Sequence, residues 1–240
     1  MLYKIVRQLV IINNISIRET MKVLEQYFGL ERNRLLFFMI SVNLLLIWMS
    51  RSVLINETVF YNSYSEQLTY ERSMELFKRI MELSWISYLF SPLMLIIKFS
   101  VLSLIIYTGF FLSDLHGEVT LGMIFTTVIA SEIIIVFASL AKFMWFAFFA
   151  GNYTLNEMNF FYPLSLINLF RQDEVAQYWI YPLQSVNLFQ VTYILMLATG
   201  LRKISSVKRE KADIIILLTN GPALILWIAL IMFITIDVQS

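Results

Sequence analysis

Cysteine is absent from this 240-residue sequence, and histidine occurs only once. Without cysteine the chain can form no disulfide, thiol nucleophile or thiolate metal site. One histidine is too few for a metal site built on paired imidazoles and for most imidazole proton relays. Charged residues make up only 15% of the chain, against about 25% in soluble domains. The net charge of +1 excludes a strongly basic nucleic-acid-binding protein, so we expect no nucleic-acid partner.

Apolar residues are abundant instead, at 59% of the chain, with a mean hydropathy of +0.72. They are concentrated in blocks long enough for transmembrane helices, which need roughly 20 apolar residues. The sequence therefore predicts an all-α, polytopic membrane helical bundle that forms a single membrane domain over residues 1–240. Five transmembrane helices are expected, near residues 35–55, 86–112, 121–142, 183–201 and 214–236. The third block stays apolar as far as Ala150, so we expect residues 143–150 to bend along the interface.

Basic residues and tryptophans predict how the bundle is oriented. Lys and Arg are more frequent in the N-terminal segment and the last loop than in the segments that five spans place on the opposite side. Because such residues favour the cytoplasmic side, we expect a cytoplasmic N-terminus and an external C-terminus. Trp48, Trp85, Trp145 and Trp179 fall at the expected outer boundary, where indole rings gather. The abundance of Asn, Ile, Lys, Phe and Tyr favours a bacterial protein of the cytoplasmic (inner) membrane.

Two segments outside the spans have amphipathic patterns. Residues 1–34 form the expected cytoplasmic interfacial segment, in which an amphipathic helix is predicted over residues 17–28. The external loop, residues 56–85, has apolar residues at helical spacing among Glu, Arg and Lys. This spacing predicts a helix over residues 65–83 that caps the bundle.

Two charged residues of opposite sign fall near the middle of neighbouring spans. Lys98 lies about twelve residues into the second span and Glu132 about eleven into the third, which at 1.5 Å per residue puts both near the bilayer midplane. Each charge alone would cost roughly 2.5–3.5 kcal/mol at that depth. We therefore predict an intramembrane ion pair between Lys98 and Glu132. The pair could serve a proton or ion pathway, but without a flanking relay of acids a structural pair that fixes helix register is favoured.

Three of the four prolines fall at positions that affect helix geometry. Pro163 and Pro182 stand among aromatic residues of the third loop, which favours short interfacial or re-entrant helices that begin at these prolines. In the fifth span Asn220 precedes Gly221 and Pro222, and the proline removes one backbone hydrogen bond. A helix kink is therefore predicted at Gly221 and Pro222. A broken helix at a substrate site is the alternative, but no matching break occurs elsewhere in the sequence.

Two polar clusters lie in loops. The predicted cytoplasmic loop after the fourth span is basic and could attract anionic lipid headgroups or simply orient the chain. Its basic residues are Arg202, Lys203, Lys208, Arg209 and Lys211. Asp114, His116 and Glu118 alternate in the second loop, and although such residues can ligate a metal, their spacing fits a solvated turn better. We therefore predict no metal site.

Catalytic signatures are missing from the sequence. It has no Walker A motif, no Gly-x-Ser-x-Gly nucleophile elbow and no His-Glu-x-x-His zinc motif. An intramembrane aspartate pair is also missing, because Asp213 and Asp237 lie at opposite ends of one span. We therefore expect no enzyme activity, no catalytic residues and no cofactor.

The segment around the last loop resembles a known family. Ala198–Ile204 (ATGLRKI) is followed by Val207–Ala212 (VKREKA), and this pattern resembles the bacterial branch of the Yip (Ypt-interacting protein) family. In that family a span ends in Gly-Leu, a short basic loop with a Lys-Ala or Arg-Ala pair follows, and the last span begins. The resemblance implies a five-helix membrane protein with a cytoplasmic N-terminus and no enzyme activity. The eukaryotic members act in vesicle trafficking with small GTPases.

Together these observations predict a non-catalytic, Yip-like inner-membrane protein that acts as a subunit or accessory factor of a membrane transport or export assembly. Its expected partners are the lipid bilayer and other membrane protein subunits. The first alternative is the permease subunit of an ABC-type transporter, which would add an ATPase as partner. The second alternative is a membrane-trafficking factor.

Overall fold

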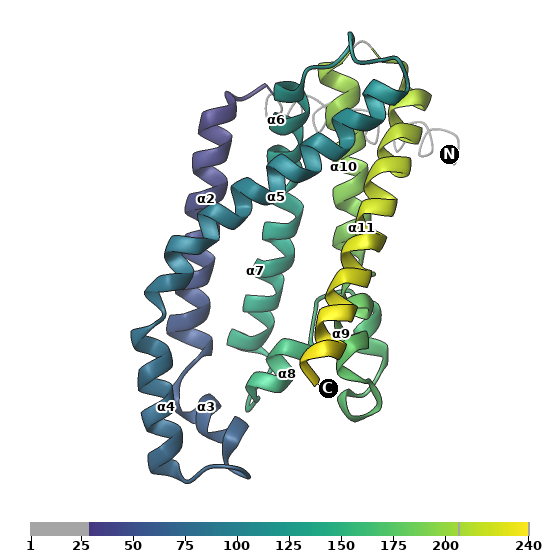
Figure 1. The fold of residues 1–240 in the computed structure, drawn as a ribbon. Coiled ribbons are helices and arrows are strands. Elements are labelled where there is room, and N and C mark those ends of the chain that lie inside the picture. Colours follow the sequence, from purple (N-terminus) through teal and green to yellow (C-terminus); the bar gives the residue numbers. More distant parts are fainter. Residues whose placement is uncertain (1–28, 206, 240) are drawn as a thin grey trace, which may run out of the picture.

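The computed structural model describes residues 29–205 and 207–239, which are predominantly helical (Figure 1). The helix predicted over residues 17–28 lies outside the described residues. Within the described part of the chain, four helical segments are long and apolar enough to cross a membrane. They are Arg32–Leu54, Trp85–Leu112, Leu121–Phe148 and Glu210–Asp237. The expected all-α membrane fold is confirmed at this level.

The four segments are built from long runs of large apolar residues, and a helix satisfies their backbone groups internally, as lipid requires. The first comprises α2 (Arg32–Met49) and a short π-helix, η1 (Ser50–Leu54). The second is α5 (Trp85–Leu112), and the third comprises α6 (Leu121–Ser131) and α7 (Ile133–Phe148). The last lies within α11 (Arg209–Gln239).

The fourth predicted span, residues 183–201, is wrong at its start. Residues 183–185 belong to a separate helix, α9 (Gln177–Ser185), and α10 begins only at Leu188 and ends at Ile204. Asn187 separates the two helices, since its backbone is extended and its side-chain oxygen accepts the Gln190 N–H at 2.7 Å. With 17 residues, α10 is shorter than the four segments above. The fifth crossing and the orientation of the termini therefore stay predictions.

The expected bend over residues 143–150 is also wrong. Helix α7 continues to Phe148, and the irregularity of the third segment lies earlier, at Glu132. Phe143 and Phe146 explain the difference, because they are buried in a cluster with Leu54 and Tyr153. The end of α7 therefore packs against the end of the first segment instead of turning into the interface.

Residues 56–85, the loop predicted to be external, contain two helices, α3 (Glu57–Tyr64) and α4 (Tyr70–Glu82), where one was predicted over residues 65–83. The Asn56 side chain caps α3 by accepting the Val59 N–H at 2.9 Å. The two helices pack through Phe60 and Phe77, whose ring centroids are 5.4 Å apart. The short helix α8 (Leu155–Phe160) holds this hairpin to the bundle, since the Leu155 N–H donates to Ser63 Oγ at 2.7 Å.

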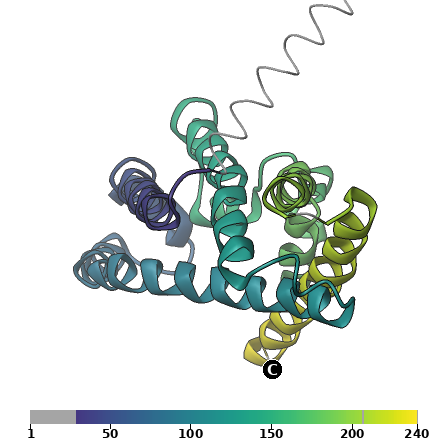
Figure 2. The same ribbon diagram turned by 90° about the horizontal axis from the view of Figure 1, so that it is seen from above.

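Helix α5 crosses the bundle obliquely, as Figures 1 and 2 show. It contacts α2, α6 and α11 along its length, whereas α10 packs against α6, α7 and α11. The chain enters α2 and leaves α11 at opposite ends of the bundle (Figure 1). We call the end with the α5–α6 and α10–α11 connections the closed end, and the end with α3, α4, α8 and α9 the open end.

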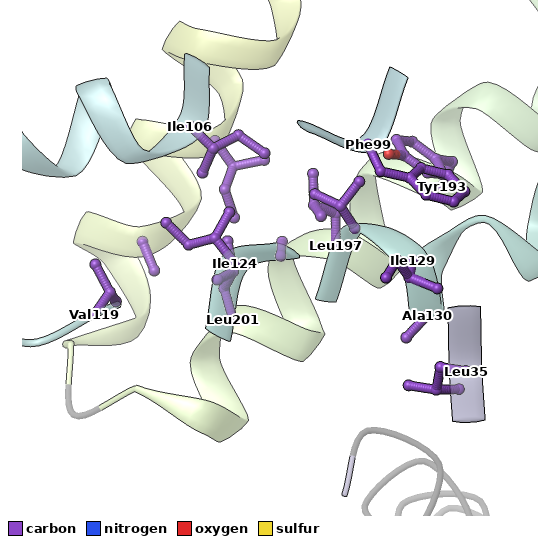
Figure 3. Close-up of a cluster of buried hydrophobic side chains, with 14 of the residues drawn as sticks. Leu35, Phe99, Ile106, Val119, Ile124, Ile129, Ala130, Tyr193, Leu197 and Leu201 are labelled. Atoms are coloured by element: carbon purple, nitrogen blue, oxygen red, sulfur yellow. The ribbon is translucent and has the colours of Figure 1, made fainter. Parts of the chain in front are cut away.

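The two ends differ in how tightly they are packed. Most of the fully buried side chains lie toward the closed end, where α5, α6, α10 and α11 meet (Figure 3). They include Phe99, Ile106, Phe110, Ile124, Val128, Ile129, Leu197, Leu201 and Ile216. Toward the open end, no side chain of α5 from Trp85 to Lys98 is buried, and none of α11 from Gly221 to Asp237. The larger buried cluster therefore lies toward the closed end, whereas the smaller one, which contains Phe143 and Phe146, lies toward the open end.

Gly109 permits the close approach of α5 and α11 at the closed end. A Cβ atom at this position would lie only 2.2 Å from Thr219 Cγ2 and 3.0 Å from Ile215 Cγ2. Replacing Gly109 with alanine should therefore force the helices apart and lower the free energy of unfolding by about 1–3 kcal/mol. Unfolding of the purified protein in mixed micelles by SDS titration measures the change. Gly117→Ala is the matched control, since nothing lies within 4 Å of its added Cβ, and equal stability of both variants would contradict the packing argument.

Candidate functional site

Glu132 occupies the junction between α6 and α7. Its N–H lies 3.2 Å from the carbonyl oxygens of both Val128 and Ile129, and its own carbonyl accepts the Ile135 N–H at 2.9 Å. The helix therefore tightens locally from i→i+4 toward i→i+3 hydrogen bonds. Such a turn in the middle of a long helix is frequent where a helix is strained or carries a functional residue.

The structure brings Lys98 and Glu132 together. Lys98 Nζ of α5 donates to Glu132 Oε1 at a distance of 2.5 Å. The Glu132 side chain is only 5% exposed, whereas the Lys98 side chain is 43% exposed. The lysine therefore reaches from the flank of α5 into the interior, where it balances the charge of the carboxylate and links α5 to the α6–α7 junction.

Other polar atoms surround this pair. Glu132 Oε2, Ser131 Oγ and the Tyr193 hydroxyl are buried and have no hydrogen-bond partner among the described residues. Tyr193 belongs to α10, and its hydroxyl lies within the electrostatic field of Glu132. Burial raises the pKa of Tyr162, and the negative charge of Glu132 raises it further. The carboxylate therefore has tyrosine neighbours from two different segments.

Sequence reasoning missed these tyrosines, because a tyrosine within an apolar stretch looks like any aromatic core residue. The only feature of the sequence that could have pointed to a polar role is the hydroxyl group of each tyrosine. A third tyrosine, Tyr181 of α9, accepts a hydrogen bond at its hydroxyl from Trp227 Nε1 of α11 at 2.8 Å. This hydrogen bond joins α9 to α11 at the open end.

The segment between α8 and α10 is held in place by polar contacts to its backbone. The Tyr162 carbonyl accepts hydrogen bonds from Ser165 Oγ at 2.7 Å and Asn168 Nδ2 at 2.6 Å. Two short 3₁₀ helices, η2 (Leu166–Leu169) and η3 (Gln172–Glu174), precede α9.

The expectation that Pro163 and Pro182 begin helices is wrong. Pro163 is buried in the turn before η2, and Pro182 lies inside α9.

The predicted basic loop does not present all of its charges to solvent. Arg202 Nε donates to Asp213 Oδ1 at 2.6 Å, and Nη2 of the same arginine also contacts this oxygen, so the pair ties α10 to α11. Lys208 and Lys211 are exposed. Lys203 is half-buried, and the structure gives no description of the Arg209 side chain.

Helix α11 continues through Gly221 and Pro222 without interruption. A broken helix of the transporter kind is therefore not seen in this helix, and the predicted kink stays a prediction. Asn220 is buried, and its Nδ2 has no hydrogen-bond partner among the described residues.

The second loop holds Asp114, His116 and Glu118 in a turn. His116 Nδ1 lies 3.9 Å from Asp114 Oδ1, and no group of three metal-ligating side chains occurs within residues 29–205 and 207–239. Two open hollows of about 400 and 440 Å³ lie along α7. Both are lined almost entirely by apolar side chains, among them Phe137 and Ala141, so neither offers the converging polar groups of a substrate site.

Comparisons with known proteins find no match for the chain among family models, curated proteins or solved structures. What the structure itself shows is a helical protein with four segments long and apolar enough to cross a membrane, in which Lys98 pairs with the buried Glu132.

Replacing one member of this pair should have unequal effects. Lys98→Met leaves a deeply buried carboxylate without its cation and should lower the free energy of unfolding by about 3–5 kcal/mol. Glu132→Met leaves an unpaired lysine, but its half-exposed, flexible side chain can extend toward the membrane surface, so the loss should be smaller, about 2 kcal/mol. The double variant should approach the stability of the wild type. SDS titration of the purified variants measures all three, and a double variant as unstable as Lys98→Met would contradict a structural pair.

Proposed function

We propose that the protein is a non-catalytic subunit or accessory factor of a membrane transport or export assembly, in the bacterial cytoplasmic membrane. The observation that carries this proposal is the use of two ion pairs between helices. Lys98 and Glu132 join α5 to the α6–α7 junction, and Arg202 and Asp213 join α10 to α11. These charges hold helices together and do not converge on either of the two hollows.

A bundle with five crossings supports this role. Helix α10 is 17 residues long and spans roughly 26 Å at 1.5 Å per residue, which is close to the thickness of the hydrocarbon core. Counting α10 as a crossing places the start of α2 and the end of α11 on opposite sides of the membrane. With the Lys and Arg bias of the loops, the closed end is cytoplasmic and the open end external.

The Yip-like pattern coincides with a compact hairpin. Its residues form the end of α10, the connection and the start of α11, where Leu201 and Ala212 are fully buried. The Gly-Leu and Lys-Ala pairs of the pattern thus serve packing at the closed end. We infer that the resemblance reflects a shared helix arrangement.

The permease alternative is less well supported. A permease needs a cytoplasmic surface that an ATPase can engage, and the connection between α5 and α6 is a short turn without a helix. The surface that we propose for a partner is the α3–α4 hairpin, which extends beyond the long helices at the open end (Figure 1). Its α4 exposes Tyr70 and Ile80 on an otherwise charged helix.

Purification of the full chain from its native host in mild detergent tests the proposed role. We expect a membrane or envelope protein to copurify in a fixed ratio, as identified by mass spectrometry. A photo-crosslinker placed at Ile80 should form an adduct with that protein. The same crosslinker at Ile225, an exposed position in the apolar part of α11, is the control and should form lipid adducts only. A copurifying ATPase would favour the permease alternative, a small GTPase would favour a trafficking factor, and a chain that purifies alone would contradict a subunit role.

A further inference from the structure

The carboxylate of Glu132 lies beside the larger of the two buried apolar clusters. On its closed-end side, Ile124, Leu197 and Leu201 are fully buried and pack together (Figure 3). On its open-end side, α5 from Trp85 to Lys98 and α11 from Gly221 to Asp237 have no buried side chains, and Phe143 and Phe146 of α7 are buried in a separate cluster with Leu54 and Tyr153. The large apolar cluster therefore closes the closed-end side of Glu132 more completely than its open-end side.

The polar atoms at this border need more hydrogen-bond partners than the protein supplies. Glu132 Oε2 needs a donor, while Ser131 Oγ and the Tyr193 hydroxyl each have a proton to donate. Buried polar groups in native structures are almost always paired, either with protein or with ordered water. A buried water typically makes two to four such hydrogen bonds, so one or two waters could pair all three atoms.

Other polar side chains lie near Glu132 or toward the open end. Tyr162 lies within the field of Glu132, and the Tyr181 hydroxyl is bonded to Trp227. Lys98 adds a second polar group, since its half-exposed side chain extends from the flank of α5 to the carboxylate. Farther along α7, Lys142 has no ion-pair partner among the described residues, and a charge inside a spanning segment usually faces a water-filled cavity or reaches the interface.

We propose that Ser131, Glu132 and Tyr193 form a binding site for water, which is continuous with the solution at the open end and sealed from the closed end by the apolar core. This goes beyond the role as a subunit, because it gives a buried carboxylate contact with solution on one side of the membrane only. The occupants of the site are water molecules hydrogen-bonded to the carboxylate and the two hydroxyls.

The absence of cysteine makes a direct test simple, because any introduced cysteine is the only thiol in the chain. Ser131→Cys reports on the site, and Ile124→Cys is the control in the sealed core. Gln67→Cys and Ser113→Cys, at exposed positions of the open and closed ends, report which side of the membrane a reagent reaches. Each purified variant is reconstituted in sealed vesicles, treated with a membrane-impermeant thiosulfonate, and followed by mass spectrometry.

We expect Ser131→Cys to be labelled at least tenfold faster than Ile124→Cys, and only from the side that labels Gln67→Cys. Labelling no faster than Ile124→Cys, or labelling from the side of Ser113→Cys, would overturn the proposal. A second measurement needs no variant. Radiolytic hydroxyl-radical footprinting of the wild-type protein should oxidise Tyr193 through its bound water but leave Phe110, which is also buried, intact, and equal protection of both rings would overturn the proposal as well.

Discussion

The contact between Lys98 and Glu132 constrains the whole bundle, because neither charge can be left alone in the interior of a membrane protein. It fixes the point on α5 that must face the α6–α7 junction, and so sets the register of both segments. Helices α2 and α10 pack against these segments, so their positions along the bundle depend on the same contact. The tightened backbone at Glu132 is part of the same arrangement, since it lies where the carboxylate must turn inward to meet the lysine.

The two halves of the bundle on either side of the Lys98–Glu132 contact differ in how they are packed. Toward the closed end, Gly109 lets α5 approach α11, and the Arg202–Asp213 pair joins α10 to α11, so large apolar side chains fill the interior. Toward the open end, Trp227 of α11 is hydrogen-bonded to Tyr181 of α9, and a smaller buried cluster joins the end of α7 to the first segment. A large buried cluster in one half beside a smaller one in the other suits a protein that stays assembled while offering surface to a partner or to water.

Much of this arrangement follows from composition and spacing alone. Charge in an apolar helix is costly, so Lys98 and Glu132 could be paired from their depth in neighbouring spans. The start of α10 was missed because the predicted span rested on average hydropathy, which does not detect the helix cap at Asn187. The straight end of α7 depends on the burial of Phe143 and Phe146 against distant residues. The tyrosines near Glu132 were missed for a related reason, since only the fold brings α10 and the segment after α8 to the same carboxylate.

The central claim, that Lys98 and Glu132 are in direct contact in a bilayer, can be measured by solid-state NMR. The protein is reconstituted in lipid with ¹⁵N-labelled lysine and glutamate labelled with ¹³C at the side-chain carboxyl, and Lys98→Met identifies the signals that belong to the pair. The account predicts a strong dipolar coupling between the Lys98 ammonium nitrogen and the Glu132 carboxyl carbon, as a 2.5 Å contact requires. The absence of that coupling in the folded protein would contradict the account.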